Sequence, residues 1–107
     1  MIGIDIVEIE RIRGMLEKYG EHFLEKVFAP AEIGYARGRK RREEFLAGRF
    51  AAKEAFMKAW GKKLVFREIE VNSNAGRPYI VYQGNHYDSV SISHERSYAI
   101  SVVILKD

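Results

Sequence analysis

Two carboxylates and a lysine in this chain have neighbours that favour metal and phosphate chemistry. Glu54 lies in the segment FLAGRFAAKEAFMKAW, which is rich in Ala and Phe and has the spacing of a largely buried helix. Lys58 follows Glu54 by one turn, and Asp5 lies in an apolar segment directly after Gly3-Ile4. A shielded carboxylate needs a cation and a nearby lysine needs an anion. Because Mg²⁺ takes one or two protein carboxylates and completes its shell with water and substrate phosphate, a magnesium–phosphate site would satisfy all three residues.

Each of these residues also has an explanation without catalysis. Glu54 and Lys58 are spaced i, i+4, a pair that stabilises any exposed helix by about 0.2–0.5 kcal/mol. Asp5 could face solvent or cap the helix that follows it, whereas Gly3 would leave room for a ligand to approach closely. Small residues favour the functional interpretation, because they make the long helix thin enough for close approach of another backbone or a ligand: Ala47, Gly48, Ala51, Ala52, Ala55 and Ala59.

Two further segments carry groups suited to phosphate. His94 and the hydroxyl of Ser93 end an expected strand, where both can donate hydrogen bonds to phosphate oxygens. The turn Gly76-Arg77-Pro78 brings a guanidinium beside exposed backbone N–H groups. A structural histidine and a plain hairpin also explain these segments. His22 and His86 have no comparable neighbours, so we interpret both as surface residues.

Residues Arg37–Arg42 include five basic side chains in six positions. Such a run is usually a solvated connection, although it could also hold an acidic partner or nucleic acid. No aromatic residue interrupts the run, and the net charge of the chain is only +3. Nucleic-acid-binding domains typically combine a basic face with stacking side chains, so we predict no nucleic-acid partner and keep this class as the alternative.

Length and composition limit the remaining possibilities. A chain of 107 residues predicts one domain, whose core has little room for a deep pocket for a large ligand. We therefore consider an active site shared between subunits. The absence of cysteine excludes disulfides, thiolate catalysis and Cys-based zinc sites. The first residues carry three acids and no basic segment precedes them, and no apolar run approaches the ~18 residues of a membrane span. We therefore predict a cytoplasmic protein without membrane association.

The hydrophobic pattern predicts a strand, four helices and then a run of strands. Alternation predicts the first strand over residues 2–7, and spacing of 3–4 predicts helices over residues 9–19, 21–27, 30–38 and 43–60. Strand-like segments then cover residues 65–71, 78–82, 89–93 and 97–105, with turns at 72–76 and 83–85. This order favours an α+β fold with a mainly antiparallel sheet packed against one long helix and several short helices.

Three motifs and one turn occur in an order that points to a known family. The motifs are GIDIVEI at Gly3–Ile9 with Arg11 following, FLAGRFAAKEA at Phe45–Ala55 with Lys58 following, and SISH at Ser91–His94. Together they resemble holo-acyl carrier protein synthases, the small class of 4′-phosphopantetheinyl transferases. In that family a Gly-Lys/Arg-Pro turn stands where this chain has Gly76-Arg77-Pro78. The likeness spans nearly the whole chain, residues 1–107, as one transferase domain.

The resemblance implies a specific reaction and its participants. Such enzymes transfer the phosphopantetheine arm of coenzyme A to a serine of apo-acyl carrier protein, leave adenosine 3′,5′-bisphosphate and serve fatty acid biosynthesis. By this likeness Asp5 and Glu54 hold Mg²⁺ against the pyrophosphate, and Lys58 contacts those phosphates and supports the leaving group. The family assembles as a homotrimer whose sites lie between neighbouring subunits.

Further residues take binding roles by the same likeness. Those expected to bind coenzyme A, besides Lys58, are Arg49, Gly76, Arg77, Pro78, Ser93 and His94. Those expected to receive the acidic carrier protein are Arg11, Arg13, Met15 and Lys18.

The chain departs from the family pattern after the long helix. The family commonly has a longer Gly-rich loop there, whereas residues Trp60–Leu64 lead almost directly into the next segment, where Lys62 and Lys63 could substitute electrostatically. A metal-dependent hydrolase of nucleotide pyrophosphates would use the same carboxylates and lysine, so it remains a second alternative.

Overall fold

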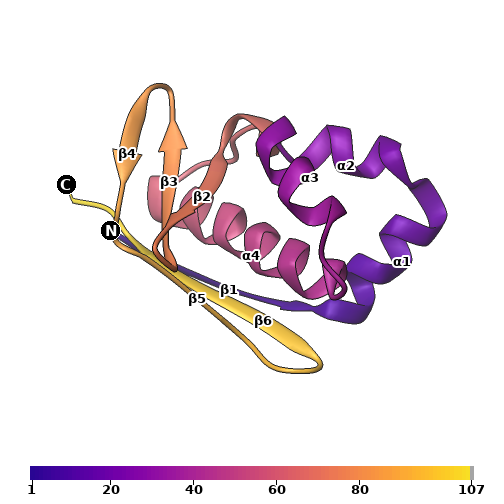
Figure 1. The fold of residues 1–107 in the computed structure, drawn as a ribbon. Helices are drawn as coiled ribbons and strands as arrows, with labels where there is room; N and C mark the ends of the chain where they lie inside the picture. The colour runs from indigo at the N-terminus through magenta and orange to yellow at the C-terminus, as the bar shows by residue number, and fades with distance from the viewer. Residues whose placement is uncertain (107) are drawn as a thin grey trace.

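The computed structural model describes residues 1–106, which fold around the long helix α4 (Arg42–Trp60). One three-stranded antiparallel sheet runs along α4, a second packs near its C-terminal half, and three shorter helices lie towards its N-terminal half (Figure 1). The predicted fold class, α+β with antiparallel strands packed against one long and several short helices, is confirmed. The predicted long helix begins one residue earlier than expected.

The first sheet has the strand order β1-β6-β5, with β1 (Ile2–Glu8) and β5 (Val90–His94) as its edges and β6 (Tyr98–Ile104) in the centre. Antiparallel pairing sets Asp5 opposite Ser101 and sets Ile92 of β5 opposite the same serine. Residues that face each other across such a pair share one face of the sheet. Asp5 and Ile92 therefore both project towards α4, one at each edge.

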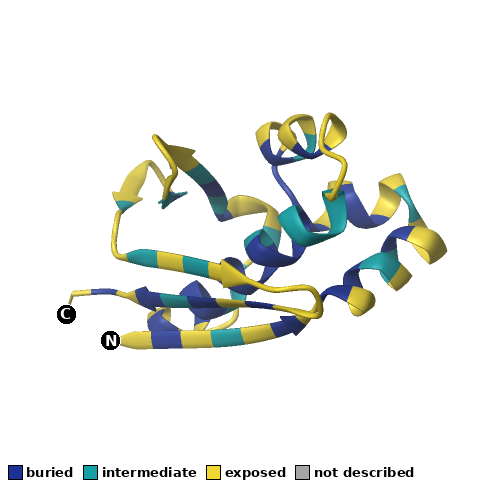
Figure 2. Cartoon of the chain, turned by 60° about the horizontal axis from the view of Figure 1, so that its bottom comes forward, coloured by how far each residue is buried: buried dark blue, intermediate teal, exposed yellow. Residues whose placement is uncertain are grey.

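The opposite face of this sheet is apolar and exposed. Successive residues of a strand point to opposite faces, and Figure 2 shows this alternation of buried and exposed residues along β1. The exposed large side chains on this outer face are Ile2, Ile4, Ile6, Tyr98, Ile100 and Ile104, which are between 36% and 68% exposed. In β6, Tyr98, Ile100, Val102 and Ile104 alternate with buried residues, and this face points away from α4.

The second sheet consists of β2 (Glu70–Asn74), β3 (Arg77–Tyr82) and β4 (Asn85–Tyr87). Its two-residue turns, Ala75-Gly76 and Gln83-Gly84, have positive φ at every position, as type I′ hairpins require. The short strand β4 was not predicted, because only three residues pair and the turn prediction extended over its first residue.

The predicted strand over residues 65–71 is wrong in its first part. Residues Phe66–Glu68 form the 3₁₀-helix η1, and the strand begins only at Glu70. The bend lets the ring of Phe66 stack on Phe50 of α4 at 5.2 Å while Ile69 is completely buried. Packing on α4 thus overrides the strand-like pattern of the segment.

Three short helices precede α4, and their ends follow residue type. The helix α1 (Ile9–Tyr19) stops at Gly20, whose φ of +55° suits glycine. The next two are α2 (Glu21–Val27) and α3 (Pro30–Arg37), and proline occupies the first turn of α3, where it costs no hydrogen bond. All three agree with the prediction within one residue. Within residues 1–106, no helix has both the length and the apolar character needed to cross a membrane.

Candidate active site

Asp5 and Lys58 contact each other where β1 passes over α4, and Glu54 lies one turn before Lys58 on the helix. Lys58 Nζ donates to Asp5 Oδ1 at 3.2 Å and to the carbonyl oxygen of Ile4 at 3.0 Å, although Lys58 and Asp5 are 53 positions apart. Glu54 is partly buried and lies one turn before Lys58, so both side chains leave the same flank of the helix. Asp5 does not cap the following helix, because the N-cap residue of α1 is Glu8.

The donors of this cluster fit a hard divalent cation such as Mg²⁺. The side chain of Asp5 is only 16% exposed, whereas that of Lys58 is 55% exposed and therefore free to adjust its position. Within residues 1–106, no three His, Cys, Asp or Glu side chains converge as a metal cluster. The protein would supply two carboxylates, and water with substrate phosphate would supply the rest, which is how Mg²⁺ is usually bound.

Gly3 allows β1 to lie directly against the backbone of α4. A Cβ atom at this position would lie 1.8 Å from the carbonyl oxygen of Ala55 and 2.7 Å from the amide nitrogen of Ala59. We expected Gly3 to leave room for a ligand, but the group that approaches it is the helix itself. This contact fixes β1 on α4 and carries Asp5, two residues later on the same strand face, to Lys58.

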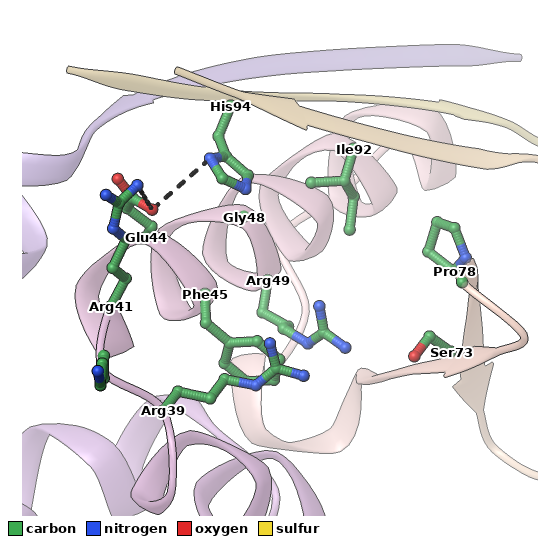
Figure 3. A pocket seen from close by; sticks show the side chains of 12 residues that line it. Arg39, Arg41, Glu44, Phe45, Gly48, Arg49, Ser73, Pro78, Ile92 and His94 are labelled. Carbon is green, nitrogen blue, oxygen red and sulfur yellow. Dashed lines mark ion pairs between the residues drawn. The ribbon is translucent and has the colours of Figure 1, made fainter. Parts of the chain in front are cut away.

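A basic pocket of about 520 Å³ opens on the other flank of α4 (Figure 3). Its walls come from the connection before α4, from α4, from the β2–β3 hairpin and from β5. The lining residues are Arg39, Lys40, Arg41, Glu44, Phe45, Gly48, Arg49, Ser73, Gly76, Pro78, Ile92 and His94. With several cations and one carboxylate, the pocket suits a polyanionic ligand.

Two arginines of this pocket share one aromatic ring. The guanidinium carbons of Arg39 and Arg49 lie 4.2 Å and 3.9 Å from the ring centroid of Phe45. Arg49 extends between Phe45 and Ser73 in Figure 3, and its buried Nε has no hydrogen-bond partner within the described chain. Burial lowers the pKa of Arg49, the charge of Glu32 opposes this shift, and Arg39 adds to it. An anionic ligand would relieve this crowding of positive charge.

Glu44 pairs with two basic residues that line the pocket. His94 Nδ1 lies 4.0 Å from Glu44 Oε2, an ion pair only when the imidazole is protonated, and Arg41 Nη1 lies 3.8 Å from the same oxygen (Figure 3). Glu44 thus occupies basic groups that an incoming phosphate would otherwise contact.

The structure gathers only some of the residues expected to bind coenzyme A. Arg49, Gly76, Pro78 and His94 line the pocket. Arg77 is exposed at the start of β3 and Ser93 projects from the outer face of β5, opposite Ile100, so neither lines it. The pocket also has lining residues that we had not assigned to coenzyme A: Arg39, Lys40, Arg41, Glu44, Phe45, Gly48, Ser73 and Ile92. The run Arg37–Arg42 was the available signal, but we had interpreted it as a solvated connection.

The pocket and the carboxylate cluster lie on opposite sides of α4. Arg49 and Glu54 are five residues apart, which separates them by about 140° around the helix axis. His94 lies on β5 and Asp5 on β1, the two edges of the first sheet. A single chain therefore carries the carboxylates and the basic pocket as two separate features.

The residues expected to receive a carrier protein all lie on α1, but not on one flank. Arg11, Met15 and Lys18 are spaced i, i+4, i+7 and form a stripe, in which the guanidinium of Arg11 lies 5.5 Å from the ring centroid of Phe50. Arg13 projects elsewhere and forms an ion pair with Glu10. The stripe thus presents two cations beside the partly buried Met15. The charge of Arg13, by contrast, is paired with that of Glu10.

Comparison with known proteins gives this geometry a family. The profile of the 4′-phosphopantetheinyl transferase superfamily matches residues 1–103. The chain belongs to this superfamily. A holo-[acyl-carrier-protein] synthase of Halothermothrix orenii is 46% identical over 96% of the chain and 94% of the relative, and one of Thermodesulfovibrio yellowstonii is 44% identical over 97% and 96%.

Solved structures of the same superfamily share the fold. A holo-[acyl-carrier-protein] synthase from Bacillus anthracis, in complex with CoA (3′,5′-ADP), has a TM-score of 0.85 and 41% identity, covering 95% of this chain and 91% of that one. The enzyme from Helicobacter pylori, in complex with coenzyme A, has a TM-score of 0.88 and 31% identity, covering 99% and 100%. The predicted family and the predicted enzyme class, holo-[acyl-carrier-protein] synthase, are confirmed.

Proposed function

We propose that this transferase catalyses Mg²⁺-dependent transfer of the 4′-phosphopantetheine arm of coenzyme A to a serine of apo-acyl carrier protein. The products are the holo-carrier and adenosine 3′,5′-bisphosphate. The single observation that carries the proposal is the convergence of Asp5 and Lys58, at 3.2 Å, beside Glu54. The carboxylates of Asp5 and Glu54 are hard oxygen donors suited to Mg²⁺, and the exposed ammonium group of Lys58 is suited to a pyrophosphate oxygen.

The reaction requires charge neutralisation more than covalent help from the protein. The serine hydroxyl gives its proton to a base such as water, its oxygen bonds to the phosphorus that carries pantetheine, and the bond from that phosphorus to the bridging oxygen breaks. Mg²⁺ held by Asp5 and Glu54 would neutralise the pyrophosphate and align it. Lys58, whose side chain is 55% exposed, would supply a second cation where negative charge builds on the departing phosphate.

The basic pocket would bind the nucleotide end of coenzyme A. Arg49 and His94 reach the pocket from α4 and β5, and Gly76 and Pro78 form part of the opposite wall. Two guanidiniums gathered on Phe45 provide a concentrated positive charge for phosphate groups. Relatives from two bacteria whose structures are complexes with coenzyme A or its nucleotide support this assignment.

We further propose a homotrimer with active sites between subunits. Two features support this assembly: the outer face of the first sheet exposes several isoleucines, and the carboxylates and the basic pocket lie on opposite sides of α4. Soluble monomers rarely expose a contiguous apolar face of this kind, and cyclic assembly could bring one protomer's carboxylates to its neighbour's pocket. By family likeness we also propose a single transferase domain, cytoplasmic location and a role in fatty acid biosynthesis.

The decisive experiment mixes the protein with coenzyme A, Mg²⁺ and apo-carrier and measures the mass of the carrier. We expect the carrier to gain the mass of one phosphopantetheine arm, and the gain to disappear with EDTA. Release of nucleotide without any change in the carrier would identify a hydrolase instead. No reaction, together with a gel shift of nucleic acid at physiological salt, would favour the nucleic-acid-binding alternative.

A further inference from the structure

One lysine and one glutamate of this chain are completely buried and paired with each other. Lys53 of α4 and Glu32 of α3 have no exposed side-chain surface, and Lys53 Nζ lies 2.7 Å from Glu32 Oε1. Burying two charges requires close pairing and further hydrogen bonds, and an unpaired charge left behind is strongly destabilising. Lys53 directly precedes Glu54 in the sequence but points into the protein, so its role differs from that of the carboxylate cluster.

Lys53 links α4 by hydrogen bonds to the segment that leads into β2. Besides its bond to Glu32, its ammonium group donates to the carbonyl oxygens of Phe66 at 3.0 Å and Ile69 at 2.5 Å. A lysine has three N–H donors, so every one is used. The lysine thereby holds η1 and the start of the β2–β3 hairpin against the helix.

Glu32 links α3 by hydrogen bonds to Lys53 of α4 and to the backbone of β2. Its Oε1 accepts from the amide of Ala29 at 2.8 Å, which closes the first turn of α3, and its Oε2 accepts from the amide of Val71 at 3.1 Å. Together with Lys53, this carboxylate links α3, α4, η1 and β2 through one buried centre. Within the described residues it is the centre at which both members of an ion pair are fully buried.

The segments joined at this centre form three walls of the basic pocket. The helix α3 leads into Arg39–Arg41, α4 carries Phe45 and Arg49, and β2 carries Ser73. Arg49 lies one turn before Lys53 on α4. The relative placement of the three walls therefore depends on one ion pair that lies behind them.

The charge of Glu32 also reaches the pocket. Burial lowers the pKa of Arg49, and the negative charge of Glu32 is the main influence that opposes this shift. Glu32 thus favours the charged form of Arg49 as well as pairing with Lys53, although it forms no hydrogen bond with Arg49. Loss of the carboxylate would remove the buried counter-charge behind the arginine that faces the ligand.

We propose that Lys53 and Glu32 are positioning residues for coenzyme A, which set its affinity by holding the three pocket walls together. This inference depends on the proposed function only in that the basic pocket is the coenzyme A site. Neither residue lines the pocket, so we expect neither to touch the ligand or the reacting atoms. The pair differs from Glu54, its neighbour in the sequence, because Glu54 is assigned to the metal and hence to turnover.

The first test uses Glu32→Gln and Lys53→Met. We expect each to raise both the KM and the calorimetric Kd for coenzyme A by roughly tenfold, the scale of one charge-assisted hydrogen bond, because the pocket walls separate. The KM for carrier should change by less than about twofold, since α1 is not bonded to the pair. General destabilisation would lower the active fraction and hence kcat, but would leave both KM values unchanged.

The double variant Glu32→Gln/Lys53→Met separates stability from positioning. It leaves no unpaired charge buried, so its Tm should exceed that of either single variant. Because the bonds to Phe66, Ile69 and Val71 are lost or altered, its Kd for coenzyme A should stay raised. A double variant with restored Tm and the wild-type Kd would overturn the proposal, even if neither single variant folds.

The matched control is Glu21→Gln. It makes the same chemical change at the exposed ion pair between Glu21 and Arg37, the last residue of α3, and should leave the KM for coenzyme A unchanged. Wild-type protein that does not bind coenzyme A in the calorimeter would refute the proposed function. Wild-type binding that persists undiminished in both single variants would instead refute only the positioning role.

Discussion

At the scale of single residues, the proposed metal ligand Asp5 and the proposed phosphate-binding Lys58 differ in their exposure to solvent. Asp5 projects from β1 towards α4 and is largely shielded, whereas Lys58 reaches it from a mostly exposed position. An ion pair of this kind contributes little to stability, because the exposed partner remains hydrated. The arrangement is therefore better explained by chemistry than by folding, and it leads to predictions in which activity and stability respond differently.

Replacing either carboxylate with its amide should abolish transfer while leaving the fold intact. Asp5→Asn and Glu54→Gln keep side-chain shape but remove the charge that holds Mg²⁺, so kcat should fall by at least ~10²-fold. The carrier mass assay at saturating Mg²⁺ measures the loss, and circular dichroism verifies the fold. Asp88→Asn, on the exposed connection after β4, is the control. Near-normal turnover in either variant would refute the metal assignment.

Lys58→Ala should lower kcat by about 10²-fold, the usual effect of removing one donor that stabilises developing charge. The Tm should change little, because the pair with Asp5 is exposed on the lysine side. Lys26→Ala removes an exposed lysine from α2 and serves as the matched control. Unchanged kcat in Lys58→Ala would mean that Lys58 serves only as the ion-pair partner of Asp5.

At the scale of elements, close contact between β1 and α4 aligns the carboxylates. Gly3→Ala would place a methyl group 1.8 Å from the carbonyl oxygen of Ala55, so the strand must move off the helix. We expect a loss of roughly 1–3 kcal/mol in the free energy of unfolding, together with lower kcat as Asp5 leaves Lys58. Urea unfolding and the mass assay measure the two effects.

The control for this change is Gly14→Ala, which has the opposite expected sign. Gly14 is exposed within α1, and a Cβ there would meet no atom within 4 Å. Alanine should stabilise this helix by about 0.5–1 kcal/mol and leave kcat unchanged. Equal stability of Gly3→Ala and wild type would show that β1 has room to move at no cost.

The stripe on α1 should steer an acidic carrier by long-range attraction. We expect the KM for carrier to rise with ionic strength, because screening weakens the attraction to Arg11 and Lys18. Arg11→Gln should reduce this salt dependence more than Arg13→Gln, since Arg13 is already paired with Glu10. A KM for carrier that ignores salt would contradict docking on this stripe.

Local rules predicted the helices of this fold better than its pocket. Proline at the start of α3 and glycine after α1 mark boundaries through backbone preference, so these helix ends are visible in the sequence. The segment around Phe66 was mispredicted, because its bend follows from stacking on Phe50, a residue far away in the chain. Contacts of this kind leave no local pattern.

The same limit applies to the candidate site. Asp5 and Glu54 were selected because carboxylates are unusual in apolar segments, and Lys58 because it follows Glu54 by one turn; the family motifs then contained all three. Arg39 was missed, because a run of basic residues looks alike whether it is solvated or stacked on a ring such as that of Phe45. The burial of Lys53 with Glu32 could not be predicted either, since the two residues are 21 positions apart.

At the scale of the whole molecule, the separation of the pocket from the carboxylates and the exposed apolar sheet face both favour association of several chains. A single chain places the basic pocket and the carboxylates on opposite sides of α4. Association through the apolar outer face of the first sheet would bury its isoleucines and bring neighbouring protomers close. Assembly and activity should therefore fail together.

Ile100→Glu tests this coupling, because Ile100 lies in the centre strand of the sheet and faces outward. If the proposed trimer forms through this face, a buried and unpaired carboxylate should shift it to monomers in light scattering and lower transfer by roughly the same factor. Val65→Glu, at an exposed valine away from this face, should change neither quantity. Full activity in a monomeric Ile100→Glu variant would mean that one protomer holds a complete site. Residual trimer with lost activity would instead indicate that the outer face contributes to the site directly, so the two measurements must be made at the same protein concentration.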